Sequence, residues 1–232
     1  MAVLIRLMLA AALAVAFNGC GNGERGNPEK KEPAPAVTVA PPPVPAQLDS
    51  RPVLATFGDS LSAGFGVEPG KSFPDIVQRL LDSEGYRYRV ANLGVSGDTT
   101  TDGVERLASV LAVKPDIVLL EFGGNDGLRG QPVSSSKQNL RLMVEALQKS
   151  GARVVLAGMT LPRNYGPEYI RAFEQIYVEV AAEYKLVRIP FLLEGVGGNA
   201  QLMQPDGIHP TAQGADIVAH TVFNFIRPLL RK

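Results

Sequence analysis

Four short polar segments hold the side chains of this chain that are best suited to chemistry, and each follows an apolar run. Together they supply a serine, backbone N–H groups left open by glycine, an amide side chain, and a carboxylate three residues ahead of a histidine. An acyl-transfer hydrolase uses such groups as nucleophile, oxyanion donors, orienting acid and base. The sequence therefore predicts a serine hydrolase. The segments are Gly58–Leu61, Ser96–Asp98, Gly123–Asp126 and Asp206–Pro210.

Ser60 is the predicted nucleophile. It comes directly after a short apolar run, on a tight loop framed by Gly58 and Gly64. Its hydroxyl can reach a carbonyl there, and its own backbone N–H can point at the oxygen that becomes negative. The alternative is a serine that only caps a helix, which is a common role.

The base is nearly settled by counting, because the chain has only two histidines. Asp206 precedes His209 by three residues, and Gly207 between them permits a tight turn. The carboxylate can then hold the imidazole Nδ1–H while Nε2 takes the serine proton. Otherwise Asp206 only forms a turn and His209 is a surface residue. His220 lies beside the apolar stripe of the last predicted helix and is expected to be an ordinary helix residue.

Two further donors complete the predicted oxyanion hole. Gly97 has no side chain that could shield its backbone N–H, and the Asn125 side chain supplies a neutral amide donor. With the N–H of Ser60, they would stabilise the negative charge of a tetrahedral intermediate. The simpler interpretation is that Gly-Gly-Asn-Asp is only a turn.

Composition limits the partners and the alternatives. The 232 residues include 45% hydrophobic residues, enough for one core, and 23 basic against 23 acidic residues, with no basic stripe that would indicate nucleic acid. A metal-dependent phosphoesterase has similar loops but needs several histidines, so no metal and no cofactor is expected. A non-catalytic envelope protein that binds acyl or glycan groups is the remaining alternative.

The elements that must position these residues alternate between strand and helix patterns. This alternation predicts a parallel sheet with helices on both faces. Residues beyond the carboxyl ends of such strands meet in one crevice, so the first three segments are expected to come together, with the fourth folding back over them. The expected strands are 53–57, 88–91, 117–122, 154–157 and 186–189, and the expected helices are 73–85, 101–111, 136–150, 167–184 and one capped by Thr211.

The chain begins with a pattern typical of export. Residues 1–19 carry Arg6 and then a short apolar run, which predicts a signal peptide. The only cysteine, Cys20, follows glycine and is the expected lipidation site; an ordinary signal peptide is the alternative. Proline-rich residues 20–50 would form a linker, or merely a flexible tail, before a hydrolase domain at 51–232. We expect an exported bacterial protein of the periplasm or envelope, held at a membrane if the lipid is added.

These motifs resemble the SGNH (GDSL) hydrolase superfamily, whose four blocks supply Ser, Gly, Asn and His in this order. The phrases GDSLSAG, GGNDGLRG, Leu161-Pro162 and DGIHP resemble in particular its thioesterase I, lysophospholipase and arylesterase branch. The resemblance covers residues 52–230. It implies a flavodoxin-like three-layer α/β/α sandwich with a mostly five-stranded parallel sheet.

The resemblance also implies the activity. It points to a cofactor-free serine esterase or thioesterase that acts through an acyl-enzyme on aryl esters, acyl-CoA-type thioesters or lysophospholipids. A carbohydrate acetylesterase of the same fold is the alternative. The family's loop after the Asn block helps to admit acyl chains, and the corresponding residues are Gly127, Leu128 and Arg129, with Leu161 and Pro162 nearby.

Overall fold

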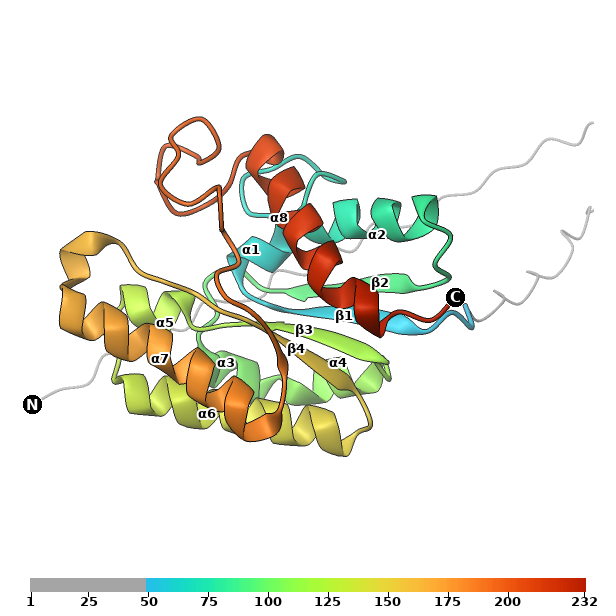
Figure 1. Ribbon diagram of the computed structural model, residues 1–232, viewed down its shortest axis with the longest axis horizontal. Helices are drawn as coiled ribbons and strands as arrows, with labels where there is room; N and C mark the ends of the chain where they lie inside the picture. The colour runs from blue at the N-terminus through green and yellow to red at the C-terminus, as the bar shows by residue number, and fades with distance from the viewer. Residues whose placement is uncertain (1–48) are drawn as a thin grey trace, which may run out of the picture. The chain divides into compact units, whose positions relative to one another are not determined.

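The computed structural model describes residues 49–232. The predicted signal peptide, the predicted lipidation site Cys20 and nearly all of the predicted linker lie outside the described residues. The predicted hydrolase domain lies within them, and its helices and strands form three layers (Figure 1).

The middle layer is a sheet of five parallel strands in the order β2-β1-β3-β4-β5. Every residue of the two central strands β1 and β3 is buried, as expected for strands covered on both faces. This order is that of flavodoxin-like folds, so the predicted fold class is confirmed. The strands are β1 (Val53–Gly58), β2 (Arg89–Gly94), β3 (Ile117–Glu121), β4 (Arg153–Ala157) and β5 (Val187–Ile189).

Helices cover both faces of the sheet (Figure 1). In the sheet β2 lies on one side of β1, whereas β3, β4 and β5 follow in order on the other side. Because the connections between parallel strands are right-handed, the helix between β1 and β2 lies on one face of the sheet and the helices that lead to β3, β4 and β5 lie on the opposite face. One face carries α2 (Phe73–Ser83) packed on α8 (Ala212–Ile226). The other carries α3 (Thr100–Glu105), α4 (Leu107–Ala112), α6 (Val133–Lys149) and α7 (Pro167–Tyr184).

Local signals set several helix starts. Ser72 and Thr99 each form a capping box with the aspartate three residues later, and Thr211 caps α8 as predicted. The helix expected at 101–111 is instead two helices, α3 and α4, because the backbone turns at Arg106, whose side chain reaches back to the ends of β1 and β2.

Short elements complete the fold. They are the helices α1 (Ser60–Ala63) and α5 (Gly124–Leu128) and the 3₁₀ turns η1 (Arg163–Tyr165) and η2 (Arg227–Leu229). Among residues 49–232, no helix combines the length and the apolar character needed to span a membrane.

Candidate active site

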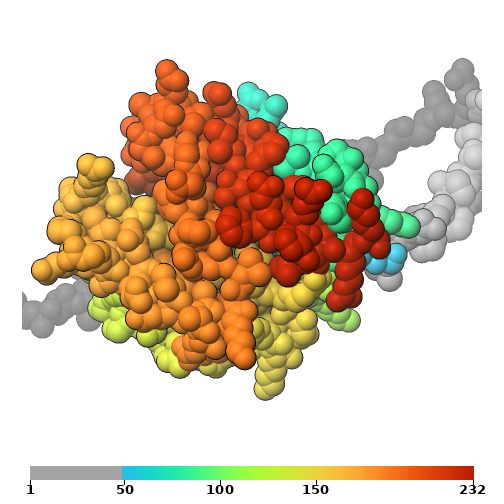
Figure 2. All heavy atoms as spheres, viewed as in Figure 1, coloured from blue at the N-terminus to red at the C-terminus, as the bar shows by residue number. Residues whose placement is uncertain are grey.

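The predicted site residues gather at one edge of the sheet. Helix α1 follows β1 and helix α5 follows β3, and both lie at the carboxyl ends of the strands (Figure 1). The segment 190–211 folds back over the same edge. In the space-filling view it stands out as a lobe beside the residues that follow α1 (Figure 2). One contact across this boundary is the hydrogen bond from Gln204 Nε2 to the Phe65 carbonyl, at 2.8 Å.

Ser60 is the first residue of α1 and is mostly buried. Asp59 caps this helix, because its Oδ1 accepts the Leu61 N–H at 3.0 Å. The helix lasts one turn and ends at Gly64, whose φ of 78° is readily adopted only by glycine. The sequence left open whether Ser60 caps a helix, and in the structure the cap is Asp59. The serine hydroxyl lies 3.5 Å from Asp59 Oδ1 and has a closer partner.

That partner is the imidazole of His209. Its Nε2 lies 2.8 Å from Ser60 Oγ, and its Nδ1 lies 2.7 Å from Asp206 Oδ2. Asp206 also forms a turn, since its Oδ1 accepts the N–H groups of Ile208 and His209. Asp206 therefore makes both contacts that the sequence allowed, the turn through Oδ1 and the contact with the imidazole through Oδ2. Three side chains from two distant parts of the chain form a continuous hydrogen-bonded series.

The charge state of Asp206 suits this arrangement. Burial raises its pKa, but the hydrogen bonds from the His209 ring and from backbone N–H groups outweigh that effect and lower the pKa to about 2. The carboxylate is thus ionised at any pH near neutrality. It can stabilise an imidazolium on His209 as that ring accepts a proton.

An aromatic ring that the sequence analysis did not single out lies against the imidazole. The rings of Phe65 and His209 have centroids 4.5 Å apart with an interplanar angle of 40°. The N–H of Phe65 donates to the Ser60 carbonyl at 3.0 Å, so the same turn positions the serine and this ring. Half of the Phe65 surface remains exposed.

The two other predicted oxyanion donors lie on either side of Ser60 in the sheet order. Gly97 follows β2 in an exposed turn with φ of 90°, a conformation that favours glycine. Asn125 lies in α5, where its Nδ2 donates to the Asp98 carbonyl at 2.9 Å and to Asp59 Oδ2 at 3.2 Å. These two hydrogen bonds join the amide to the loops after β1 and β2. An asparagine that only forms a turn would need no such contacts with distant loops.

A buried pair of carboxyl groups, Asp59 and Glu121, lies beneath the serine. Glu121 Oε2 accepts hydrogen bonds from Asp59 N, Ser62 N and Ser62 Oγ, the last at 2.7 Å, while Oε1 is buried without a partner among the described residues. Burial raises the pKa of both groups, and the charge of Asp59 raises that of Glu121 further. The pKa of Glu121 is raised more strongly than that of Asp59, because Glu121 is fully buried and also feels the neighbouring carboxylate.

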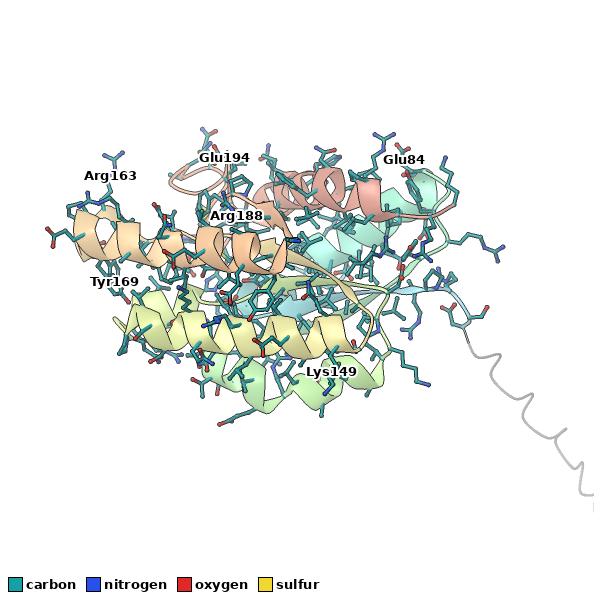
Figure 3. All side chains as sticks on the ribbon, turned by 60° about the horizontal axis from the view of Figure 1, so that its bottom comes forward. Glu84, Lys149, Arg163, Tyr169, Arg188 and Glu194 are labelled. Carbon is teal, nitrogen blue, oxygen red and sulfur yellow. The ribbon has the colours of Figure 1, made fainter. Side chains whose placement is uncertain are left out.

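The predicted substrate loop has a mixed environment. Gly127 is buried, and a Cβ there would meet Leu161 at 2.5 Å, so Leu161 packs beneath α5 as part of the core. Arg129 is exposed and donates to the Gly97 carbonyl at 2.9 Å. The Leu128 carbonyl accepts the hydroxyl of Tyr165 at 2.7 Å. Pro162 is exposed, and the next side chain, Arg163, points out from the molecule (Figure 3).

The second histidine lies apart from this cluster. His220 is exposed on α8 and its Nδ1 lies 2.9 Å from the Asp216 carbonyl, one turn earlier on the same helix. Within residues 49–232, no three His, Cys, Asp or Glu side chains are grouped so that they could hold a metal ion.

A serine hydrogen-bonded to an imidazole, beside amide groups at the edge of an α/β sheet, is the arrangement that acyl-transfer hydrolases use. The chain belongs to the GDSL-like lipase/acylhydrolase family, whose model matches residues 56–217. It is therefore a carboxylic ester hydrolase, and the resemblance noted from the sequence is confirmed.

Individual relatives agree with this assignment. Esterase TesA of Pseudomonas aeruginosa is 45% identical over 178 residues, 76% of this chain and 89% of that protein. An arylesterase of Vibrio mimicus is 39% identical over 170 residues, 73% and 85% of the two chains. "Thioesterase 1/protease 1/lysophospholipase L1" of Escherichia coli is 36% identical over 178 residues, 76% and 84%. The crystal structure of TesA superposes with a TM-score of 0.75 over 77% of this chain and 99% of TesA.

Proposed function

We propose that this protein hydrolyses acyl esters and thioesters with Ser60 as nucleophile, His209 as general base and Asp206 as the orienting acid. The observation that carries the proposal is the series Asp206–His209–Ser60, with contacts of 2.7 and 2.8 Å. Both lengths are those of good hydrogen bonds in which a proton can pass from hydroxyl to imidazole.

The reaction proceeds in two halves. Ser60 Oγ attacks the carbonyl carbon as its proton moves to His209 Nε2, and the carbonyl oxygen becomes negative. The bond to the leaving alkoxide or thiolate breaks, and that group takes the proton from His209. Water then attacks the acyl-serine, gives a proton to the same ring, and releases the acid while Oγ regains its proton. No electron acceptor or metal is needed for either half.

The N–H groups of Ser60 and Gly97 and the amide of Asn125 would bind the negative oxygen. The first N–H groups of a helix have no intrahelical acceptor, so that of Ser60 is open to a substrate. The Asn125 side-chain amide donates to the Asp98 carbonyl and to Asp59 Oδ2. The longer bond, to Asp59, is the one that the oxyanion would replace or share.

Apolar side chains on the site loops support an apolar acyl substrate over an acetylated sugar. Phe65, Val95 and Ile208 are exposed large hydrophobic residues, and they come from the segments that carry Ser60, Gly97 and His209 respectively. Exposed apolar groups gathered near a site bind apolar ligands. The names of the relatives, esterase, arylesterase and thioesterase, agree with this class.

A panel of substrates tests the proposal. Purified protein would be assayed on p-nitrophenyl esters of increasing chain length, on acyl-CoA thioesters, on a lysophospholipid and on acetylated xylose. We expect kcat/KM to rise from acetyl to medium acyl chains. A preference for the acetylated sugar would contradict the proposed substrate class and support the carbohydrate acetylesterase alternative.

The pH dependence should show a single ionisation on the acid side. Only the unprotonated His209 ring can accept the serine proton, so kcat/KM should fall as pH is lowered. Asp206, with a pKa of about 2, stays ionised until the pH approaches that value. Its contribution to stability, present above its unfolded pKa, is lost only as pH drops toward 2. A slope of two in log kcat/KM against pH would contradict this single ionisation.

Dialysis against EDTA should leave the activity unchanged. Activity lost on dialysis and restored by zinc or manganese would contradict the metal-free serine mechanism.

We also propose that the protein is exported and anchored by lipid at Cys20. A short apolar run behind Arg6, a glycine before the only cysteine, and a proline-rich segment up to residue 50 support this. Intact-mass analysis of membrane-extracted protein should show a chain that begins at Cys20 with diacylglyceryl and N-acyl groups. A free thiol, or a chain that starts further along, would contradict the anchor and leave the catalytic proposal unaffected.

A further inference from the structure

One largely buried cation has no part in the reaction described above. Arg106 lies at the break between α3 and α4, and 21% of its side chain is exposed. Its Nε donates to Asp98 Oδ2 at 2.5 Å, Nη1 to the Leu93 carbonyl at 2.7 Å, and Nη2 to the Gly58 carbonyl at 2.7 Å. Each of the three nitrogens therefore has an acceptor, and each acceptor is in a different strand end or loop.

Two aromatic rings determine where the guanidinium plane can lie. The Arg106 carbon Cζ is 4.5 Å from the centroid of Phe57 and 5.4 Å from that of Phe122. These rings come from the ends of β1 and β3 and meet each other edge to face at 4.9 Å. Cation–π contact restrains the plane while the hydrogen bonds restrain its edge. We call these three hydrogen bonds from one planar guanidinium the Arg106 fork. A lysine has a single, freely rotating ammonium and cannot reproduce it.

The acceptors of Arg106 adjoin the proposed oxyanion donors. The Gly58 carbonyl belongs to the residue two before Ser60, and Asp98 directly follows Gly97. The carbonyl of Asp98 in turn accepts the Asn125 amide at 2.9 Å. A movement of the guanidinium would therefore shift all three donors relative to one another.

The loop after β2 needs such support. Its residues 95–97 are exposed, so packing restrains them little. Backbone hydrogen bonds join Val95 N to the Gly58 carbonyl at 3.1 Å and Asp98 N to the Val95 carbonyl at 3.2 Å. The Arg129 bond to the Gly97 carbonyl lies at the surface, where water competes for it. The ion pair between Arg106 and Asp98 is the less exposed attachment of this loop to the sheet.

We propose that Arg106 is a positioning residue for hydrolysis, which holds the oxyanion donors of Ser60, Gly97 and Asn125 at their mutual spacing by binding Gly58, Leu93 and Asp98 at once. The inference rests on the proposed oxyanion roles. Because a misplacement of about 1 Å can cost about a hundredfold in rate, loss of the fork should act on the transition state more than on substrate binding.

Arg106→Met and Arg106→Lys test the inference in the full chain. We expect Arg106→Met to lower kcat on a p-nitrophenyl ester about a hundredfold, with KM within about twofold of wild type. Arg106→Lys keeps the charge and should still lose about tenfold in kcat. A boronic acid that forms a tetrahedral adduct with serine should bind each variant more weakly by the same factor as the loss in kcat/KM.

Arg153→Met is the matched control. Arg153, at the start of β4, pairs with Asp116 at 2.5 Å with side-chain exposures of 30% and 26%, and lies at the opposite end of the strands from the site. Its loss removes a similar ion pair, so its melting temperature should fall while kcat stays at the wild-type value. Circular dichroism at the assay temperature shows whether each variant is folded.

Two outcomes overturn the inference. The first is a folded Arg106→Met variant that keeps wild-type kcat and only melts at a lower temperature, as the control does. The second applies if Arg106→Met does not fold, and it is wild-type kcat in Arg106→Lys. Ser60→Ala, assayed alongside, separates this failure from a failure of the proposed function. Activity that survives Ser60→Ala would refute the serine mechanism itself, whereas its loss beside a fully active Arg106 variant would refute only the role of Arg106.

Discussion

Alanine at Ser60 or at His209 is expected to lower kcat by about four to six orders of magnitude. Ser60→Ala removes the atom that forms the acyl-enzyme, and His209→Ala removes the acceptor that lies 2.8 Å from it. Since the two act as one unit, the double variant should be scarcely worse than either single variant. The measurement is kcat on a chromogenic ester with folding verified by circular dichroism.

His220→Ala is the matched control for this prediction. His220 is exposed on α8 and its ring nitrogen Nδ1 pairs with Asp216 of the same helix, away from Ser60, so its replacement should leave kcat unchanged. A fluorophosphonate should label wild type on Ser60 alone. An adduct mapped to another residue would remove Ser60 from the role, and activity lost in His220→Ala but kept in His209→Ala would reverse the histidine assignment.

Asn125→Ala is expected to lower kcat about a hundredfold or more, as for the loss of one oxyanion donor. KM should change little, because the amide would bind the negative oxygen more strongly than the neutral carbonyl. The stability cost should be about 1–3 kcal/mol, because Asp59 Oδ2 and the Asp98 carbonyl lose the Asn125 amide while Asp59 Oδ1 keeps its bond from the Leu61 N–H.

The neighbouring residue gives the contrasting control. Asp126 is buried and accepts hydrogen bonds from Thr100 N, Thr100 Oγ1 and Ser136 Oγ, which join α5 to α3 and α6. Asp126→Ala should therefore lower the melting temperature more than Asn125→Ala does, while costing less in kcat at low temperature. If Asn125→Ala melts early and turns over normally in the cold, asparagine is only a structural residue of the turn.

Much of the fold and site could be predicted from local patterns. The helix at 167–184 occurs with the predicted bounds, and the cap at Thr211 forms as expected. The turn that joins Asp206 to His209 also follows from spacing alone. Capping and turn hydrogen bonds connect residues only two to four positions apart, so the residues that make them can be seen together in the sequence.

Other features depend on contacts between distant parts of the chain. Glu121 binds Ser62 across 59 positions, and Arg106 binds Gly58 across 48. Glu121 stands in an apolar strand pattern and Arg106 in a helical one, so neither pattern indicates a buried polar role. The one available signal was the carboxyl group of Glu121 itself, because a carboxyl group within a central strand must find hydrogen bonds.

The sequence by itself determined the class of fold, and it predicted the order of the polar segments and the candidate serine, histidine and aspartate. Only the tertiary structure decided that Ser60 and His209, 149 positions apart, lie within hydrogen-bond distance and that the Phe65 ring packs against the imidazole at a tilt. It also decided that a carboxyl pair and an arginine lie beneath the site. The physical reason is that pairing of β1 with β2 and β3 sets which strand ends become neighbours. That pairing results from burying the whole core at once, and no single segment encodes it.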